Sequence, residues 1–374
     1  MDPNRTTLIV GTAKGLFSYH GNADGGWTLG PELLSGWEVS TTLLEPSAGG
    51  LRILAATVHY AYGATIRESR DGGQTWTQLA GRPAYAEGSG RKLNRIWQLA
   101  HNGHAGTIYA GVDEAGLFVS RDDAGSWAEV EGLSNFPTRK DWSPGAGGLC
   151  LHTILTDPNN PNRMWIAISA VGTFRSDDGG ESWQQKCAGL PTVYGNPDDA
   201  CPVYCVHRMV LHPTRPDTLF LQFHGGVYVS RDAGDSWQKI ESGLPSNFGF
   251  PMAVTPAGTL LIAPLKSDEQ RVFAGGRFAI YRSTDEGASW SATTSGLPTE
   301  PTFTGVLRDA MCAGNGGAAY FGTTCGQMFA SADDGETWQR LPGTLPRVLS
   351  VRAVEGGIAK ARRREAVAGE PSRA

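Results

Sequence analysis

The sequence predicts an all-β protein, folded as a single seven-bladed β-propeller of four-stranded antiparallel blades. An eight-residue motif, Ser-x-Asp-x-(Gly/Ala)-x-(Ser/Thr)-Trp, occurs six times, and a decayed seventh copy ends at Trp27. The tryptophans that end the seven copies are 49, 51, 56, 54, 53 and 48 residues apart, a period typical of propeller blades. With 50 Gly, 22 Pro and 11 Trp in 374 residues, the composition suits many short strands joined by tight turns.

The motif itself predicts a hairpin. The six full copies lie at 69–76, 120–127, 176–183, 230–237, 283–290 and 331–338. Each stands between two short apolar runs, so it joins two strands. Its Asp can accept backbone N–H bonds across the turn, its Gly can adopt positive φ, and its Trp can anchor the turn on the sheet. A ligand-binding or catalytic role is the weaker reading, because six similar turns around a ring cannot all form one site.

The motif resembles the Asp-box, or bacterial neuraminidase repeat. This element occurs in sialidases, xyloglucanases, sortilin-type receptors and photosystem II stability/assembly factors. The resemblance extends over nearly the whole chain and implies a propeller, but it implies no single activity, because these relatives do unrelated things. A sialidase would be expected to carry an Arg-Ile-Pro-type segment near its start, and this chain has none there. The assembly factors are the most similar in size and in having one propeller.

The order of the elements predicts how the ring closes. Residues 6–29 supply strands at 7–11 and 15–18 and a third at Trp27, but no innermost strand. Residues 347–354 follow the last motif and supply that missing strand, so the two ends of the chain share one blade and leave no unpaired edge. The complete blades are expected at 37–79, 93–131, 148–187, 203–241, 248–292 and 303–342, with an insertion at 265–277. The propeller domain is therefore placed at 6–356, and the polar, aperiodic residues 357–374 are expected to form a disordered tail.

Charge and composition exclude some classes of partner. There are 32 Lys and Arg against 37 Asp and Glu, a net charge of −5, and no long basic stripe in the repeats, so we expect no nucleic acid partner. No apolar run reaches the length of a membrane span. The first residues lack the apolar core of a signal peptide, so a cytoplasmic location is expected, with the six cysteines mostly reduced. A Cys201–Cys205 bridge would be expected only in an oxidising compartment.

The channel mouth is the predicted site. In a propeller, the connections between blades and between the second and third strands lie on one face, opposite the motif turns. The loops at 80–92, 131–148 and 188–202 on that face are long and polar, and loop-built mouths commonly hold ligands. Charged residues at the starts of innermost strands could clamp a carboxylate or phosphate, or could instead form ion pairs between blades. The predicted binding residues are Glu38, His59, Arg95, Trp142, His152, His207, Arg208, His224, Arg308 and Asp309.

Histidines on this face raise the alternative of a transition-metal ion. Cys150 and His152 in one blade occupy the same positions as Cys205 and His207 in the next. With the nearby loops, the weak candidates for metal ligands are His59, His152, His207 and His224. The simpler reading is that the cysteines pack as small hydrophobic residues and the histidines bond to neighbours, so no cofactor is predicted.

Three functions remain open from the sequence. The favoured one is a binding or assembly scaffold that holds a small molecule, a glycan or a protein at the channel mouth. The second is a glycosidase-like hydrolase with paired carboxylates as acid and base. The third is a metal-dependent enzyme that uses the histidines. The carboxylate candidates are Glu38, Glu87, Asp113, Glu114, Asp141, Asp198, Asp199 and Asp309.

Overall fold

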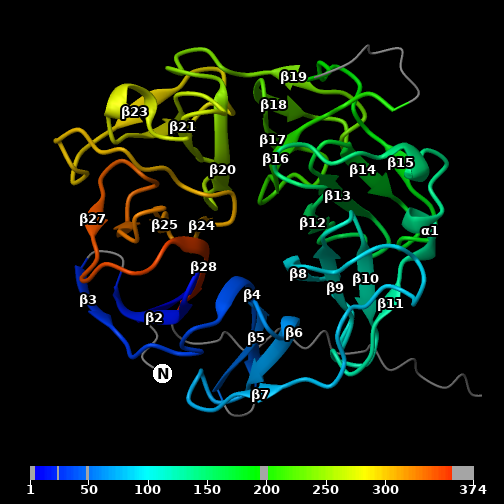
Figure 1. Ribbon diagram of the computed structural model, residues 1–374. Coiled ribbons are helices and arrows are strands. Elements are labelled where there is room, and N and C mark those ends of the chain that lie inside the picture. The colour runs from blue at the N-terminus through cyan, green and yellow to red at the C-terminus, as the bar shows by residue number, and fades with distance from the viewer. Residues whose placement is uncertain (1–4, 23–24, 48–49, 194–200, 356–374) are drawn as a thin grey trace, which may run out of the picture.

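Seven four-stranded antiparallel sheets stand around a central axis in the computed structural model, which describes residues 5–22, 25–47, 50–193 and 201–355 (Figure 1). The predicted fold class and the predicted number of blades are confirmed. The first strand of each sheet faces the centre of the ring, and the fourth strand lies at the rim (Figure 1).

The blades are numbered here from the N-terminus. Blade 1 contains β28 (Val348–Glu355), β1 (Thr6–Thr12), β2 (Gly15–Asn22) and β3 (Gly25–Leu29). Blade 2 contains β4 (Glu38–Ser47), β5 (Gly50–His59), β6 (Gly63–Ser69) and β7 (Thr77–Gln78). Blade 3 contains β8 (Ile96–His101), β9 (Ile108–Val112), β10 (Leu117–Ser120) and β11 (Ala128–Glu129). Blade 4 contains β12 (Leu151–Thr156), β13 (Met164–Ile168), β14 (Gly172–Ser176) and β15 (Gln184–Gln185).

The remaining blades repeat this order. Blade 5 contains β16 (Val206–Leu211), β17 (Leu219–Phe223), β18 (Gly226–Ser230) and β19 (Gln238–Lys239). Blade 6 contains β20 (Phe248–Val254), β21 (Leu260–Leu265), β22 (Ile280–Ser283) and β23 (Ser291–Thr293). Blade 7 contains β24 (Met311–Ala313), β25 (Ala319–Gly322), β26 (Met328–Ser331) and β27 (Gln339–Arg340). Short helices α1 (Glu131–Ser134), η1 (Arg139–Asp141) and η2 (Ala274–Gly276) lie in connections, and none in the described part of the chain could cross a bilayer.

The ring closes through β28, as the sequence predicts. β28 pairs antiparallel with β1 from Thr6 opposite Glu355 to Thr12 opposite Val348. The innermost strand of blade 1 therefore comes from the C-terminal end of the propeller, and its other three strands come from the N-terminal end. This pairing satisfies the backbone groups that two open sheet edges would otherwise expose. The predicted tail at 357–374 lies outside the described residues.

The octapeptide turns, the six copies of the motif given above, join the third and fourth strands of blades 2 to 7. In each of them the Ser hydroxyl donates to the Asp carboxylate. In the copy at 283–290, Gly287 N–H donates to Ser283 Oγ at 2.7 Å, and Ser289 donates to the Asp285 carboxylate from its N–H (2.9 Å) and its hydroxyl (2.6 Å). Gly287 has a φ of +88°, which explains the small residue at this position. The motif thus closes a hairpin.

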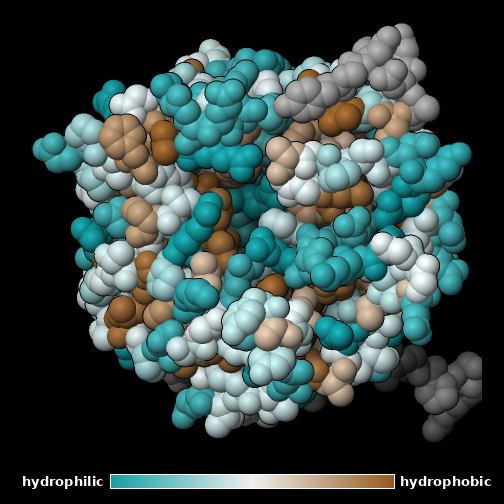
Figure 2. All heavy atoms as spheres, in the orientation of Figure 1, coloured by the Kyte–Doolittle hydropathy of each residue, from teal (hydrophilic) through white to brown (hydrophobic). Residues whose placement is uncertain are grey.

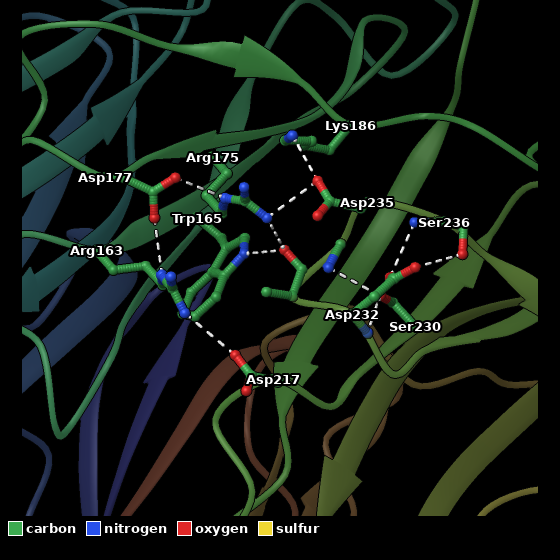
Figure 3. Close-up of polar contacts among 12 residues, drawn as sticks. Arg163, Trp165, Arg175, Asp177, Lys186, Asp217, Ser230, Asp232, Asp235 and Ser236 are labelled. Atoms are coloured by element: carbon green, nitrogen blue, oxygen red, sulfur yellow. Dashed lines mark hydrogen bonds and ion pairs between the residues drawn. The ribbon is translucent and has the colours of Figure 1, made fainter.

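An octapeptide turn also ties neighbouring blades together, as Figure 3 shows for blades 4 and 5. The indole N–H of Trp165 on β13 donates to the Ala233 carbonyl of the next octapeptide turn at 2.8 Å. The Asp235 carboxylate in the same turn forms ion pairs with Arg175 at 3.1 Å and Lys186 at 2.5 Å (Figure 3). Trp165 is 1% exposed, so this contact joins the hydrophobic packing between blades to the turn on the rim.

Candidate functional site

A cavity of about 360 Å³ lies at the channel mouth. Its lining comes from six of the seven blades, from the starts of innermost strands and from connections between second and third strands, so it is central. Figure 2 shows the ring hollowed near its centre, with hydrophilic residues around the hollow. Because successive strands alternate in direction, this face is opposite the octapeptide turns. The lining residues are Ala13, Glu38, Ser40, Arg95, Trp97, Gly147, His152, Phe250, Arg271, Leu307, Arg308, Asp309, Arg347 and Leu349.

A bulge near the start of the innermost strand aims side chains at this cavity. In six blades the register between the first two strands shifts there, so that one extra residue is left on the inner strand. Bulges re-aim side chains and occur often beside functional sites. The residues in these bulges are Leu349, Ser40, Trp97, His152, His207 and Phe250, and all but His207 line the cavity.

Asp309, which lines the cavity, contacts residues of three other blades. Its two carboxylate oxygens accept hydrogen bonds from Arg208 of β16 at 2.8 Å and from Arg352 of β28 at 2.6 Å. Thr41 of β4 donates to the same carboxylate at 3.2 Å. Asp309 is 6% exposed, and its partners come from blades 1, 2 and 5. The interblade ion pairs considered from the sequence are therefore present for Asp309 and Arg208, and the two arginines leave this cluster with a net positive charge.

A second ion pair stands on the wall of the cavity. Arg95 contacts the Glu38 carboxylate at 2.5 Å, and its guanidinium lies 4.8 Å from the ring centre of Trp97. The indole N–H of Trp97 donates to Asp113, which lies just behind the lining. Burial raises the pKa of Asp113, against the effects of the Trp97 hydrogen bond and of Arg95. Asp113 is therefore easier to protonate than a free Asp side chain.

Three further arginines face the cavity without a carboxylate partner. Within the described chain, Arg271, Arg308 and Arg347 form no ion pair with Asp or Glu. Arg308 donates to Cys150 Sγ at 3.4 Å and lies over the rings of Trp97 and Phe250, at 5.2 Å and 5.8 Å from their centres. Guanidinium groups held against aromatic faces keep their N–H edges available to an anion.

The histidines divide into separate environments. His152 has both ring nitrogens engaged, by Val206 O at 3.0 Å and Thr153 Oγ1 at 3.0 Å. His207 and His224 lie together, with ring centres 5.5 Å apart, and Cys205 Sγ is 3.5 Å from His207 Nε2. The equivalence of His152 and His207 is confirmed, because both are bulge residues, but only His207 has a second histidine beside it.

Five of the ten predicted binding residues do not line the cavity, namely His59, Trp142, His207, Arg208 and His224. Arg208 still reaches it through Asp309, and His207 and His224 form the pair described above, whereas Trp142 and His59 lie elsewhere. Trp142 is 7% exposed and packs against Phe136 and Phe174 in the hydrophobic interior. His59 lies in the turn after β5, where it stacks on Tyr60 and Tyr62. Neither belongs to the lining of the channel mouth.

The carboxylate candidates are also dispersed. Of these, only Glu38 and Asp309 line the cavity, and both are in ion pairs. Glu87 and Asp141 are exposed, Glu114 is half-buried beside Asp113, and Asp198 and Asp199 lie outside the described residues.

Sequence reasoning missed several lining residues, mainly apolar ones. Trp97, Phe250, Leu307 and Leu349 read as ordinary strand or loop residues in the sequence. The signal that could have found them is positional, since each lies where an innermost strand begins. Arg347 was likewise not singled out, whereas Arg271 fell within the insertion expected on this face.

All six cysteines are free thiols, including Cys201 and Cys205. Burial raises the pKa of Cys205 and of Cys150, and Arg308 counteracts this in both. Neither thiol is therefore poised as a reactive thiolate.

Comparisons with known proteins agree on the fold. No family model matches the sequence. The chain is 26% identical over 219 residues to the xyloglucanase Xgh74A of Acetivibrio thermocellus, a match that covers 50% of this chain and 24% of that protein. The chain thus spans about a quarter of the length of this curated relative.

Two solved structures have similar folds. An ancestral GH74 enzyme superposes with a TM-score of 0.51 at 18% identity, covering 85% of this chain and 38% of that one. YCF48 bound to D1 peptide superposes with a TM-score of 0.53 at 16% identity, covering 84% of this chain and 89% of that one. At these identities the likeness shows a shared propeller fold.

Proposed function

We propose that this chain is a binding module of the Asp-box propeller group, and that its channel mouth holds the anionic part of a small ligand, a carboxylate or a phosphate. The observation that carries the proposal is the set of three arginines, Arg271, Arg308 and Arg347, that face one cavity without carboxylate partners in the described chain. Uncompensated guanidinium groups around a cavity favour a negatively charged occupant.

The charge around the cavity supports this choice. Four arginines line it against two carboxylates, and the carboxylates are already engaged, Glu38 by Arg95 and Asp309 by Arg208 and Arg352. Arg308 is half-buried, so water screens its attraction for an anion less than it would at the surface.

The size and the walls suit a small molecule. A volume of about 360 Å³ is at the lower end of the range for ligand pockets. Trp97, Phe250 and the Leu residues 307 and 349 provide apolar walls beside the arginines. This mixture of apolar wall and a few convergent charges is typical of pockets that bind a small molecule in one orientation.

The test is ligand binding by calorimetry, with citrate, inorganic pyrophosphate and glucose 6-phosphate as probes. We expect at least one probe to bind the wild type and Arg308→Gln to weaken that binding about tenfold or more, which is about 1.4 kcal/mol. The matched control is Arg215→Gln, because Arg215 pairs with Glu286 away from the cavity. Equal affinity in the wild type and Arg308→Gln, or no binding of any probe, would contradict the proposal. An acidic peptide in the same titration tests for a protein partner, a mode for which YCF48 with its bound peptide is the structural parallel.

A glycosidase-like hydrolase is the second candidate. Two observations favour it: the similarity to a xyloglucanase over half of the chain, and the raised pKa of the buried Asp113 beside Trp97. In this version Asp113 acts as general acid and Glu38 as the second carboxylate, since Asp309 is held by two arginines. Release of reducing sugar from xyloglucan oligosaccharides, abolished in both Asp113→Asn and Glu38→Gln, would support it. Absence of turnover on these substrates, or turnover that survives both substitutions, would rule it out.

A further inference from the structure

We propose that Cys205, His207 and His224 form a mononuclear site for a zinc-class transition-metal ion at the rim of the channel mouth, separate from the arginine-lined cavity. Cys205 and His207 lie at the start of β16, and His224 lies in the turn between β17 and β18. Their ligand atoms all lie within 4.8 Å of one another. None of the three residues lines the cavity, so this site does not depend on the anion proposal.

The spacing of the first two ligands fits one ion. Cys205 Sγ and His207 Nε2 are 3.5 Å apart. A tetrahedral zinc ion with Zn–S of about 2.3 Å and Zn–N of about 2.0 Å places sulfur and nitrogen about 3.5 Å from each other. The observed distance between these two atoms is therefore the one that a single shared ion requires.

The protein holds His207 in the tautomer that a metal needs. His207 Nδ1 is 2.6 Å from the carbonyl oxygen of Gly249 on β20. A carbonyl only accepts hydrogen bonds, so Nδ1 carries the proton and the lone pair is on Nε2, the atom beside Cys205. The ring is 3% exposed and packs between Phe248 and Phe250. A backbone carbonyl that fixes the outer nitrogen of a ligating histidine is a recurrent arrangement at metal sites.

His224 supplies the third ligand from a neighbouring turn. Its backbone N–H donates to the Cys205 carbonyl at 2.9 Å, which ties the turn to the start of β16. Its Nε2 is 3.6 Å from the Asp268 carboxylate, contributed by the insertion in blade 6. Two imidazole nitrogens on one zinc ion are about 3.3 Å apart, so the half-buried His224 closes inward on binding. Asp268 then either orients His224 through its outer nitrogen or takes the fourth position.

The chemistry of these ligands selects the metal. One thiolate and two imidazoles suit zinc or copper and do not suit magnesium or calcium, which prefer oxygen. Zinc binds cysteine as the thiolate, so the ion displaces the thiol proton when it binds sulfur. The resulting thiolate offsets the repulsion between the ion and the nearby Arg308.

The first experiment measures zinc in the full-length protein. The untagged chain, purified without chelators, is loaded with zinc, freed of excess, and titrated against a chromophoric chelator while its metal content is measured by mass spectrometry. We expect about one equivalent of zinc, and an affinity reduced on the order of 100-fold or more in Cys205→Ser and in His207→Gln. Matched controls are Cys325→Ser and His104→Gln, which remove an exposed thiol and an exposed imidazole elsewhere, and both should bind as the wild type does.

A spectroscopic measurement identifies the ligands. Cobalt in place of zinc should give a sulfur-to-metal charge-transfer band in the near ultraviolet that disappears in Cys205→Ser. If circular dichroism shows that His207→Gln does not fold, His224→Gln replaces it, since His224 is on a half-buried turn. The proposal is overturned if the wild type retains no zinc or cobalt, or if binding is equal in the wild type, Cys205→Ser and His224→Gln.

Discussion

Arg352 donates to the Asp309 carboxylate at 2.6 Å, and this contact joins the strand that closes the ring to the blade that precedes it. Arg352 lies on β28 of blade 1, and Asp309 lies immediately before β24 of blade 7. The second carboxylate oxygen accepts Arg208 from β16 of blade 5 at 2.8 Å. One buried carboxylate thus neutralises parts of two guanidiniums that would otherwise repel each other at the centre of the propeller.

Loss of the Asp309 charge should destabilise the ring. Asp309→Asn keeps the shape of the side chain but leaves Arg208 and Arg352 without a counter-charge, so the free energy of unfolding in urea should fall by about 3–5 kcal/mol. The control is Asp217→Asn, because Asp217 pairs with Arg163 and its side chain is 63% exposed. That variant should lose no more than about 1 kcal/mol. Similar losses in the two variants would contradict the structural role given to Asp309.

The indole hydrogen bond between blades 4 and 5 should be measurable by itself. Trp165→Phe keeps a large ring in the interface but removes the donor to Ala233 O. Arg175 also donates to that carbonyl, so the acceptor stays satisfied. The free energy of unfolding should fall by about 1 kcal/mol for the lost hydrogen bond, and by a further amount because the phenyl ring buries less area than the indole.

Trp127→Phe is the matched control for this substitution. The indole N–H of Trp127 is buried and has no hydrogen-bond partner in the described part of the protein. Its replacement removes part of a half-buried ring but no hydrogen bond, so urea unfolding should show a smaller loss than for Trp165→Phe. A larger loss for Trp127→Phe would show that ring packing, and not the hydrogen bond, dominates these interfaces.

The octapeptide turns should make the protein sensitive to acid. The hydroxyl and the backbone N–H of Ser289, with the Ser283 hydroxyl, lower the pKa of Asp285 to about 2. An unfolded Asp has a pKa of about 3.9, so this stabilisation is complete above that value and is lost as the pH falls toward about 2. Asp285→Asn should therefore lower the melting temperature near neutral pH and show a smaller further decrease on acidification. Glu300→Gln, at an exposed site, should behave as the wild type; an unchanged acid profile in Asp285→Asn would contradict this account.

His152 should contribute a pH dependence in a higher window. Burial, and then the charge of Arg308, hold the pKa of His152 well below its usual value. The unfolded chain takes up a proton below about pH 6.5 that the folded chain does not, so stability falls as the pH decreases from there. His152→Gln should flatten the dependence of urea stability on pH between about 6.5 and 5. His104→Gln, which removes an exposed histidine, should keep the wild-type slope, and a wild-type slope in His152→Gln would be inconsistent with this burial effect.

The fold was accessible from the sequence because its signals are local and repeated. The Ser, Asp and Gly positions of the turn bond to one another within eight residues, so each copy marks one hairpin without reference to the rest of the chain. The spacing of the copies predicts the number of blades, and the extra strand after the last copy predicts that β28 closes the ring. Glu38, Arg95, Arg308 and Asp309 were expected at the mouth because they lie at the starts of innermost strands, and His152 because its blade repeats the Cys-x-His pattern of the next one. All five line the cavity.

Which side chains meet at the mouth depends on contacts between blades. Asp309 bonds to residues of three other blades, and the side chains that meet across the channel are far apart along the chain, so no spacing in the sequence relates them. A bulge of one residue turned Trp97 and Phe250 toward the cavity, and strand alternation by itself gives no sign of such a bulge. Trp142 belongs to a loop of mostly polar residues, yet its ring packs in the interior against Phe174. Burying a large aromatic ring is favourable, and this determines its position. The repeated motif therefore predicts the ring and the face that carries the channel mouth, and the packing of seven blades around one axis sets which charges, rings and imidazoles meet there.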